Sequence, residues 1–210
     1  MIIQRNAMDF REFKEKVKNY PLFGSDLLDM LSPCPQALRN QVNRWQKKGY
    51  IIALKRGTYA LSPRERSVGL SAKLLANTLY SPSYISLESA LSHYKLIPEK
   101  VAATTSVTTR KTKRFTNPVG AFIFRNLKKE LFFGFREEKD EYGFKYFIAE
   151  PEKALLDYLY LNLGKIRKID KDYFEASLRL QNRARLDRKR IARYIKNYKT
   201  KKLERLLKML

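Results

Sequence analysis

The chain has very few residues of the kinds that build disulfide bonds or zinc sites. Its 210 residues include one cysteine, Cys34, and one histidine, His93, so it can form no internal disulfide and offers no His/Cys cluster for zinc. We interpret both residues as packing or surface positions. The sequence also contains no P-loop, no Gly-rich dinucleotide turn and no Ser or Cys paired with a histidine in a nucleophile motif. It therefore predicts a protein that is not an enzyme and that holds no metal or cofactor.

Long apolar segments are lacking as well. The apolar runs are as short as residues 121–124 and 131–133, far below the ~18 consecutive apolar residues of a membrane span. We therefore expect no membrane partner. Residues 1–9 contain no apolar core of the length found in a signal peptide, which predicts a cytoplasmic location.

Acidic residues are scarce relative to basic ones. The chain has 44 Lys and Arg against 21 Asp and Glu, a net charge of +23, which favours a polyanionic partner. Hydrophobic residues make up 44% and aromatic residues 12%, far more than a disordered basic tail carries. Because an ordinary domain has ~150 residues, the length predicts one large or two small folded domains.

Two apolar patterns near the N-terminus have the spacing of amphipathic helices. The first helix is predicted from apolar residues at helical spacing: Phe10, Phe13, Val17 and Tyr20. Pro21 and Gly24 interrupt this pattern. A second, short helix is predicted from a further apolar group: Leu27, Leu28, Met30 and Leu31. Ser25 offers a side-chain oxygen as the N-cap of this second helix.

A third helix is predicted between Pro35, at the first helical position, and Gly49, just past the end. Leu38, Val42 and Trp45 fall within about 60° of arc on this helix and should face a core. The opposite face contains no acidic residue, and five polar side chains lie within about 100° of arc on it: Gln36, Arg39, Asn40, Asn43 and Lys47. An ordinary solvated helix face is the alternative interpretation.

These residue types match the edges of DNA bases. Arg donates a fork of hydrogen bonds to guanine, and Asn or Gln pairs bidentately with adenine. After the third helix, residues 50–54 and 58–61 predict a hairpin, with the basic turn Lys55-Arg56-Gly57 at its tip. Three helices and a basic hairpin are the arrangement of a winged helix-turn-helix, although winged helices also serve as protein-interaction modules. The predicted DNA-binding residues are Gln36, Arg39, Asn40, Asn43, Arg44, Lys47, Lys55 and Arg56.

Within this set, different residues have different expected roles. We expect Arg39, Asn40 and Asn43 to read bases. We expect Lys47, Lys55 and Arg56 to contact phosphates, which contributes affinity and salt dependence rather than sequence choice.

The sequence predicts an α+β fold in two domains. Residues 1–62 form the winged helix-turn-helix, the polar and charged residues 63–69 form a linker, and residues 70–210 form a mixed α/β domain that ends in basic helices. In the second domain, helices are predicted over residues 70–79, after a cap at Ser86, and from Pro151, where the helix is apolar almost all round and should be buried. Strands are predicted over residues 101–109, 121–124, 131–135 and 146–149.

The last third of the chain is strongly basic. Residues 164–210 contain 17 Lys or Arg against 5 Asp or Glu, a net charge of +12. These residues are either the solvated faces of packed amphipathic helices or a second surface that holds a nucleic-acid backbone. We favour the second interpretation, because the excess charge is too large for salt-bridge balancing alone.

Three strings in the two predicted domains resemble the AbiEi family of antitoxins. They are GYIIALKRGTYAL at residues 49–61, YISLESAL at 84–91 and IAEPEKALLD at 148–157. Their order and spacing also match, and the likeness spans roughly residues 22–161. In that family a winged-helix domain precedes a mixed α/β domain, and members look like repressors of the operon that encodes them and a nucleotidyltransferase-like toxin.

The resemblance implies a role in abortive infection, a form of phage defence. It implies that the winged helix binds inverted repeats in the promoter, and that the second domain is needed to neutralise the toxin. The family is usually classed as type IV, which implies that no stable complex forms with the toxin, although direct binding remains an alternative. One chain on each half of an inverted repeat would explain a palindromic operator, so we expect a monomer in solution.

Two alternative functions belong to other classes. A metal-dependent nuclease would need converging carboxylates and a lysine, and the chain offers Glu88, Asp140, Glu150, Glu152, Lys153 and Asp157. Their spacing does not support such a site, because residues 150–154 are typical of the acidic first turn of a helix. A non-sequence-specific DNA- or RNA-binding protein is the other alternative. Against RNA, four tyrosines fall on apolar stripes and are predicted to be core: Tyr20, Tyr158, Tyr194 and Tyr198.

Overall fold

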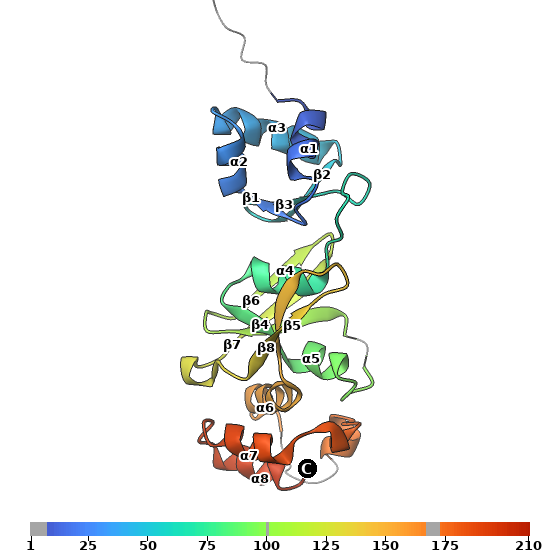
Figure 1. Ribbon diagram of the computed structural model, residues 1–210. Coiled ribbons are helices and arrows are strands. Elements are labelled where there is room, and N and C mark those ends of the chain that lie inside the picture. Colours follow the sequence, from blue (N-terminus) through green and yellow to red (C-terminus); the bar gives the residue numbers. More distant parts are fainter. Residues whose placement is uncertain (1–7, 100, 167–172) are drawn as a thin grey trace, which may run out of the picture. The chain divides into compact units, whose positions relative to one another are not determined.

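The computed structural model describes residues 8–99, 101–166 and 173–210. These residues form two compact units, and Figure 1 shows the elements of each. The first unit contains the residues up to Ser71 together with Thr116–Val119, and the second contains Ala72–Phe115 and Gly120–Leu210. Residues 1–7 of the predicted N-terminal domain and residues 167–172 of the predicted basic segment lie outside the described residues.

The first unit consists of helices and a small antiparallel sheet. Its helices begin and end close to the predicted positions: α1 (Phe10–Val17), α2 (Ser25–Leu31) and α3 (Pro35–Lys47). Its sheet has the order β1-β3-β2, and the strands are β1 (Phe23–Gly24), β2 (Ile51–Lys55) and β3 (Thr58–Leu61). β2 and β3 form the predicted hairpin, in which Ile51 lies opposite Leu61.

Aromatic rings fill the core of this unit. The ring centroids of Phe13 and Trp45 lie 4.9 Å apart, which joins α1 to α3. Leu38 and Val42 are each 1% exposed and Trp45 is 7% exposed, so the predicted core face of α3 is confirmed. Because α1 and the hairpin pack on this face, the polar residues on the opposite side of α3 are left to solvent.

Two predictions near the first two helices are wrong. Tyr20 lies beyond the end of α1 and is 49% exposed, because the helix stops at Val17 and the turn before Pro21 directs the tyrosine outward. Ser25 is the first residue of α2, and the N-cap is Gly24. The Ser25 hydroxyl donates instead to the Gly57 carbonyl at 3.5 Å, which joins α2 to the β2–β3 turn.

The second unit is built on a mixed sheet with the order β6-β7-β5-β4-β9-β8. The strands are β4 (Ser83–Ile85), β5 (Ala103–Thr108), β6 (Lys113–Asn117), β7 (Gly120–Asn126), β8 (Phe135–Lys139) and β9 (Lys145–Ala149). β5 runs parallel to β7 and β4 runs parallel to β9, whereas the pairs β4–β5 and β8–β9 are antiparallel. The structure is therefore a mixture of helices and sheets, as predicted.

Helices cover both faces of this sheet. Successive side chains of a strand point to opposite faces, and the central strand β4 shows the two layers. The Ser83 hydroxyl donates to the Ala76 carbonyl of α4 (Ala72–Leu79) at 3.2 Å. The neighbouring Tyr84 hydroxyl donates to Asp157 of α6 (Pro151–Asn162) at 3.0 Å. The helix α5 (Leu87–His93) packs against both β5 and α6.

The helix α6 lies between the sheet and the C-terminal helices (Figure 1). These are α7 (Arg188–Ile195) and α8 (Lys201–Leu207), which follow a π-helical turn at Tyr173–Ser177 and a short 3-10 helix at Arg183–Arg185. α6 begins at Pro151 and is buried, as predicted, but its buried residues include Glu152, Lys153 and Asp157.

The strand predicted over residues 131–135 is wrong. Lys129–Leu131 form a short 3-10 helix, and β8 begins only at Phe135, after Gly134 takes a positive φ of 70°. The edge strands β6 and β8 were not predicted, because charged residues replace the apolar alternation of half-buried strands there. No helix in the described part of the chain is long and apolar enough to cross a membrane.

Candidate nucleic-acid interface

The outer face of α3 carries most of the predicted DNA-binding residues. At 100° per residue, Gln36, Asn40, Asn43 and Lys47 lie together on this face, and all four are exposed. Arg44 is also exposed and lies at one edge of the face. The Gln36 side-chain amide donates to the Asn40 Oδ1 atom at 3.2 Å, whereas the Asn43 side chain has no partner among the described residues. Its amide is therefore available to a ligand.

Arg39 lies at the opposite edge of the same face and differs from its neighbours. Its Nη2 atom donates to both carboxylate oxygens of Asp29 in α2, at 2.5 and 2.8 Å. The two side chains are 42% and 45% exposed, so water screens this pair. The sequence of α3 gave no sign of Asp29, because the residue comes from the preceding helix. The acid-free surface expected from α3 alone thus has one carboxylate at its edge.

The β2–β3 turn presents the other predicted residues. Gly57 has a φ of 74°, a conformation that glycine adopts at little cost, and its carbonyl accepts a hydrogen bond from the Ser25 amide at 3.1 Å. Arg56 is exposed and Lys55 is half-buried. Within the same unit, the Asn117 side chain donates to the Leu54 carbonyl at 3.2 Å. The turn is therefore held from two sides, with Arg56 as its most accessible cation.

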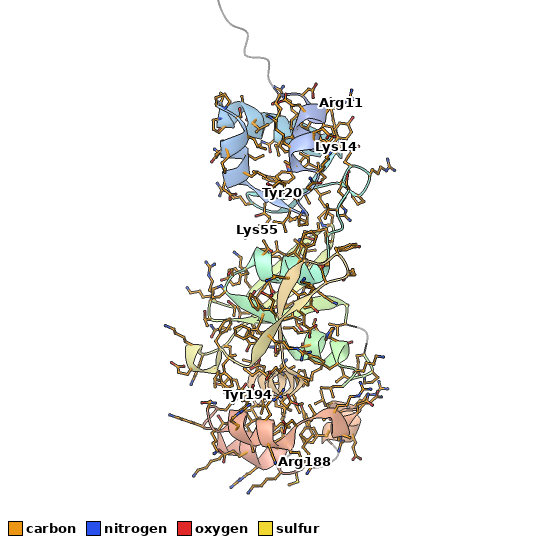
Figure 2. All side chains as sticks on the ribbon, viewed as in Figure 1. Arg11, Lys14, Tyr20, Lys55, Arg188 and Tyr194 are labelled. Atoms are coloured by element: carbon orange, nitrogen blue, oxygen red, sulfur yellow. The ribbon has the colours of Figure 1, made fainter. Side chains whose placement is uncertain are left out.

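The lysines of α1 offer a comparison for the cations of α3. Lys14, which Figure 2 labels together with Arg11, lies 2.9 Å from Glu65. Lys16 of α1 and Lys18, the residue directly after it, each pair with a glutamate of α1, at 2.9 and 2.5 Å. In contrast, Arg44, Lys47 and Arg56 have no carboxylate partner in the described residue ranges. Carboxylates of the described residues therefore leave the charges of Arg44, Lys47 and Arg56 unpaired, in contrast to those of Lys14, Lys16 and Lys18.

The structure also explains the carboxylates of α6, which the nuclease alternative required. Glu152 is 2% exposed and accepts a hydrogen bond from the Asp187 amide at 2.8 Å. Arg190 lies 3.4 Å from Glu152 and 3.7 Å from Glu150. The first turn of α6 thus binds the start of α7. Among the described residues, no group of three or more His, Cys, Asp or Glu side chains could hold a metal ion.

A buried polar cluster lies behind this first turn. The Asp157 carboxylate accepts hydrogen bonds from Tyr84 at 3.0 Å, Ser86 at 2.9 Å and Tyr198 at 2.8 Å, and it pairs with Lys153. Lys153 and Asp157 are both fully buried. Burial raises the pKa values of the Tyr84 and Tyr198 hydroxyls well above their usual value, with a further contribution from the Asp157 charge. Burial also lowers the pKa of the Lys153 amine, which Asp157 opposes.

This cluster fastens the C-terminal helices to the sheet. Tyr198, which lies between α7 and α8, also accepts a hydrogen bond from Lys153 at 2.8 Å. Tyr194 lies on the side of α7 that faces α6 (Figure 2), and its hydroxyl donates to Glu150 at 2.5 Å. Tyr198 is 4% exposed, so its predicted core position is confirmed, whereas Tyr158 and Tyr194 are partly exposed. Ser86 is the N-cap residue of α5, but its hydroxyl bonds to Asp157 rather than to the helix.

The outer sides of α7 and α8 are strongly basic. Arg190 is used internally, and Lys202 donates to the carbonyls of Leu163 and Ile166 at 2.7 and 2.8 Å. Eight other cations of this segment are exposed and have no carboxylate partner in the described structure: Arg188, Lys189, Arg193, Lys196, Lys199, Lys201, Arg205 and Lys208. Some cations of the basic segment therefore stabilise the packing and others remain in solvent, and the prediction that the exposed ones hold a nucleic-acid backbone stays a prediction.

Comparison of the sequence with models of protein families, and with curated protein sequences, finds no match.

Proposed function

We propose that the first unit is a winged helix-turn-helix that binds double-stranded DNA sequence-specifically. The observation that supports this most strongly is the outer face of α3, where exposed amides and cations gather beside the basic β2–β3 turn. Three residues, 32–34, separate α2 from α3, a turn of the length found in helix-turn-helix motifs. An exposed α-helix of this composition fits the major groove of DNA.

The contacts divide into base reading and backbone binding. Asn40 and Asn43 lie at the centre of the exposed face and would pair with adenine edges. Arg39 would read guanine after it leaves Asp29 and binds the base. The Asp29 carboxylate therefore competes with DNA for this side chain. Four cations would contact phosphates at the edges of the interface: Arg44, Lys47, Lys55 and Arg56.

We further propose that the protein is an antitoxin of the AbiEi type. The three strings that resemble this family support the proposal, and they lie in the β2–β3 hairpin, in β4–α5 and in β9–α6. Such a protein would repress its own toxin–antitoxin operon by binding promoter inverted repeats. It would also counteract a nucleotidyltransferase-like toxin in the cytoplasm, without a stable complex and as a monomer in solution.

A binding titration tests the DNA-binding proposal. The full chain is titrated by fluorescence anisotropy against a duplex of its own upstream region and against a scrambled duplex, across a salt series. We expect a preference of ~10³ or more for the native duplex at physiological salt. Equal, steeply salt-dependent binding to both duplexes would contradict base reading and leave only backbone binding.

Single substitutions then locate the reading residues. We expect Asn43→Ala to weaken binding to the native duplex by about 1 to 3 kcal/mol and to leave binding to the scrambled duplex almost unchanged. Asn19→Ala is the matched control, because Asn19 is an exposed asparagine in the turn just after α1. Equal losses on both duplexes would show that Asn43 does not read a base.

The Arg39–Asp29 pair gives a second, independent test. Asp29→Asn removes the competing carboxylate, so we expect binding to the native duplex to become several-fold tighter at low salt. Arg39→Ala should weaken binding, and in the double variant the gain from Asp29→Asn should disappear. A gain that persists without Arg39 would mean that Asp29 acts only through general repulsion of DNA.

A further inference from the structure

A second basic surface lies at one edge of the sheet of the second unit. β5 and β7 are parallel neighbours, and Thr108 at the end of β5 lies opposite Asn126 at the end of β7. The segments that follow the two strands therefore leave the sheet at the same edge. The Leu127 amide donates to the Thr108 carbonyl at 2.8 Å, which keeps the two segments side by side.

Six cations stand in these two segments and at the start of β6, which continues the first segment, and we call them the edge patch. All six are exposed, and no carboxylate of the described residues pairs with any of them. Glu130, which follows the second segment, is the acidic residue nearest in sequence. The members of the edge patch are Arg110, Lys111, Lys113, Arg114, Lys128 and Lys129.

The rings of Tyr80 and Phe115, which we call the aromatic platform, lie beside two of these cations. The Arg110 guanidinium lies 4.5 Å from the centre of the Tyr80 ring, and the Lys113 amine lies 5.6 Å from the same ring and 5.0 Å from Phe115. Tyr80 packs in turn on Phe124, with ring centroids 5.4 Å apart. The Arg110 Nη1 atom donates to the Ser81 carbonyl at 3.2 Å, so the guanidinium is held at one nitrogen and its remaining donors can meet a ligand.

The backbone of the first segment is braced as well. The Asn126 side-chain amide donates to the Arg110 carbonyl at 2.7 Å, and the Asn126 backbone N–H donates to the Thr112 hydroxyl at 3.1 Å. The Arg110 amide donates to the Thr108 hydroxyl at 3.1 Å. Because the segment is already ordered, a ligand that binds here avoids part of the entropy cost of ordering it.

We propose that the edge patch is a second DNA-binding site, which binds the phosphates of a duplex and reads no bases. The inference rests on the proposed function for the identity of the nucleic acid. Clustered Arg and Lys without amide side chains fit phosphate oxygens, and Arg binds them bidentately. Tyr80 is already covered by two cations, so it offers no free ring on which a single-stranded base could stack. Its aromatic neighbours are packed rather than exposed, which disfavours insertion into a lipid surface.

The salt dependence of DNA binding by the full chain tests the edge patch. The double variant Arg110→Gln/Lys113→Gln removes two cations. If both contact phosphates, the slope of log K against log salt becomes shallower by about 1.8, which makes binding about 30-fold weaker at 0.15 M salt. The loss should be the same on the native and the scrambled duplex. The matched control is Lys139→Gln/Lys145→Gln, which removes two cations from the β8–β9 hairpin and should change the slope by less than about 0.5.

A second double variant controls for structural damage, because it removes two cations of the edge patch without touching the aromatic platform. Lys111 and Arg114 form no contact with Tyr80 among the described residues, so Lys111→Gln/Arg114→Gln should leave the far-ultraviolet circular dichroism unchanged and still reduce the slope. An unchanged slope in both double variants would overturn the proposal. So would variants that lose binding to vesicles of phosphatidylserine and phosphatidylcholine while they bind DNA like the original chain.

The same titrations separate this inference from the proposed function. If the chain binds both duplexes equally and the edge-patch variants still lower the slope, base reading by α3 fails and the edge patch stands. If the native duplex is preferred but the edge-patch variants match the control, the edge patch fails and base reading stands. If the full chain does not bind duplex DNA even at low salt, both fail.

Discussion

Replacement of Asp157 by alanine gives the sharpest test of how the second unit is held together. The carboxylate is fully buried and accepts hydrogen bonds from Tyr84, Ser86 and Tyr198, at 2.8 to 3.0 Å, in addition to its ion pair with Lys153. The variant removes the acceptor shared by side chains of β4, of the β4–α5 connection, of α6 and of the α7–α8 connection. It leaves the Lys153 amine buried without its counter-charge.

The expected loss follows from these contacts. Breaking a buried ion pair by removing one partner costs about 3 to 5 kcal/mol, and each buried hydroxyl left without an acceptor costs about 1 to 3 kcal/mol. The contributions do not add, because Tyr198 keeps its contact with Lys153 and the cavity can relax. We therefore expect a loss of at least ~4 kcal/mol, which is a large share of the ~5 to 15 kcal/mol that stabilises an ordinary domain.

Urea unfolding with two probes measures this loss. The only tryptophan, Trp45, lies in the first unit, so its fluorescence follows that unit alone, whereas circular dichroism follows both. We expect Asp157→Ala to lower the urea midpoint of the second unit and to leave the Trp45 transition unchanged. The exposed residue Glu141 provides a control, since Glu141→Ala should change stability by less than about 0.5 kcal/mol.

A further variant separates the charge from the packing. Lys153→Met/Asp157→Leu replaces the ion pair by apolar side chains, and it should be more stable than Asp157→Ala because no unpaired charge remains buried. The opposite outcome is a free energy of unfolding for Asp157→Ala within about 1 kcal/mol of that of the original chain, with the same slope against urea concentration. It would show that the cluster does not fasten the C-terminal helices.

Three further predictions concern the Gly57 turn, the buried tyrosines and the Cys34 thiol. Gly57→Ala should destabilise the first unit by about 1 to 2 kcal/mol, measured by Trp45 fluorescence, because φ is 74° and the new Cβ would lie 3.0 Å from the Ser25 Oγ atom; an unchanged midpoint would contradict this. Above pH 10 the second unit should lose stability by up to ~1.4 kcal/mol per pH unit for each tyrosine whose pKa burial raises, because the unfolded chain releases protons that folded Tyr84 and Tyr198 keep. Urea midpoints between pH 8 and 11.5 measure this loss, and Tyr198→Phe should reduce it. The exposed thiol of Cys34 should react with a thiol reagent in native buffer as completely as in urea, and protection in native buffer would show that it is covered.

Much of the fold follows from local patterns in the sequence. The helices α1 to α3, the β2–β3 hairpin and α6 have strong apolar periodicity or clear end signals such as Pro35 and Pro151. The edge strands could not be predicted, because β6 (KRFTN) and β8 (FREEK) carry charges where a strand with one buried face would alternate. The three-residue strand β4 is buried along its whole length, and so short an apolar run has no periodicity to read.

The candidate interface was predictable in part. The outer face of α3 could be derived from its own sequence, because helical periodicity fixes which residues share a face. The Asp29–Arg39 pair could not, since it depends on how α2 packs against α3. The edge patch was missed for a similar reason. Its two segments are separated in sequence, and only the parallel pairing of β5 with β7 brings them together.

The positions of the carboxylates determine which surfaces carry the net charge of +23. Many acidic residues serve as internal partners: glutamates neutralise the lysines of α1, Asp157 holds Lys153, and Glu150 and Glu152 hold Arg190. Among the described residues, groups of cations without a carboxylate partner lie on α3, on the edge patch and on the outer sides of α7 and α8. On α3, the exposed amides of Asn40 and Asn43 stand beside the cations on one helix face, at positions from which they would read bases. Substitutions on the other two surfaces should lower affinity for every duplex alike, so the ratio of native to scrambled binding, rather than affinity alone, reports the contribution of α3.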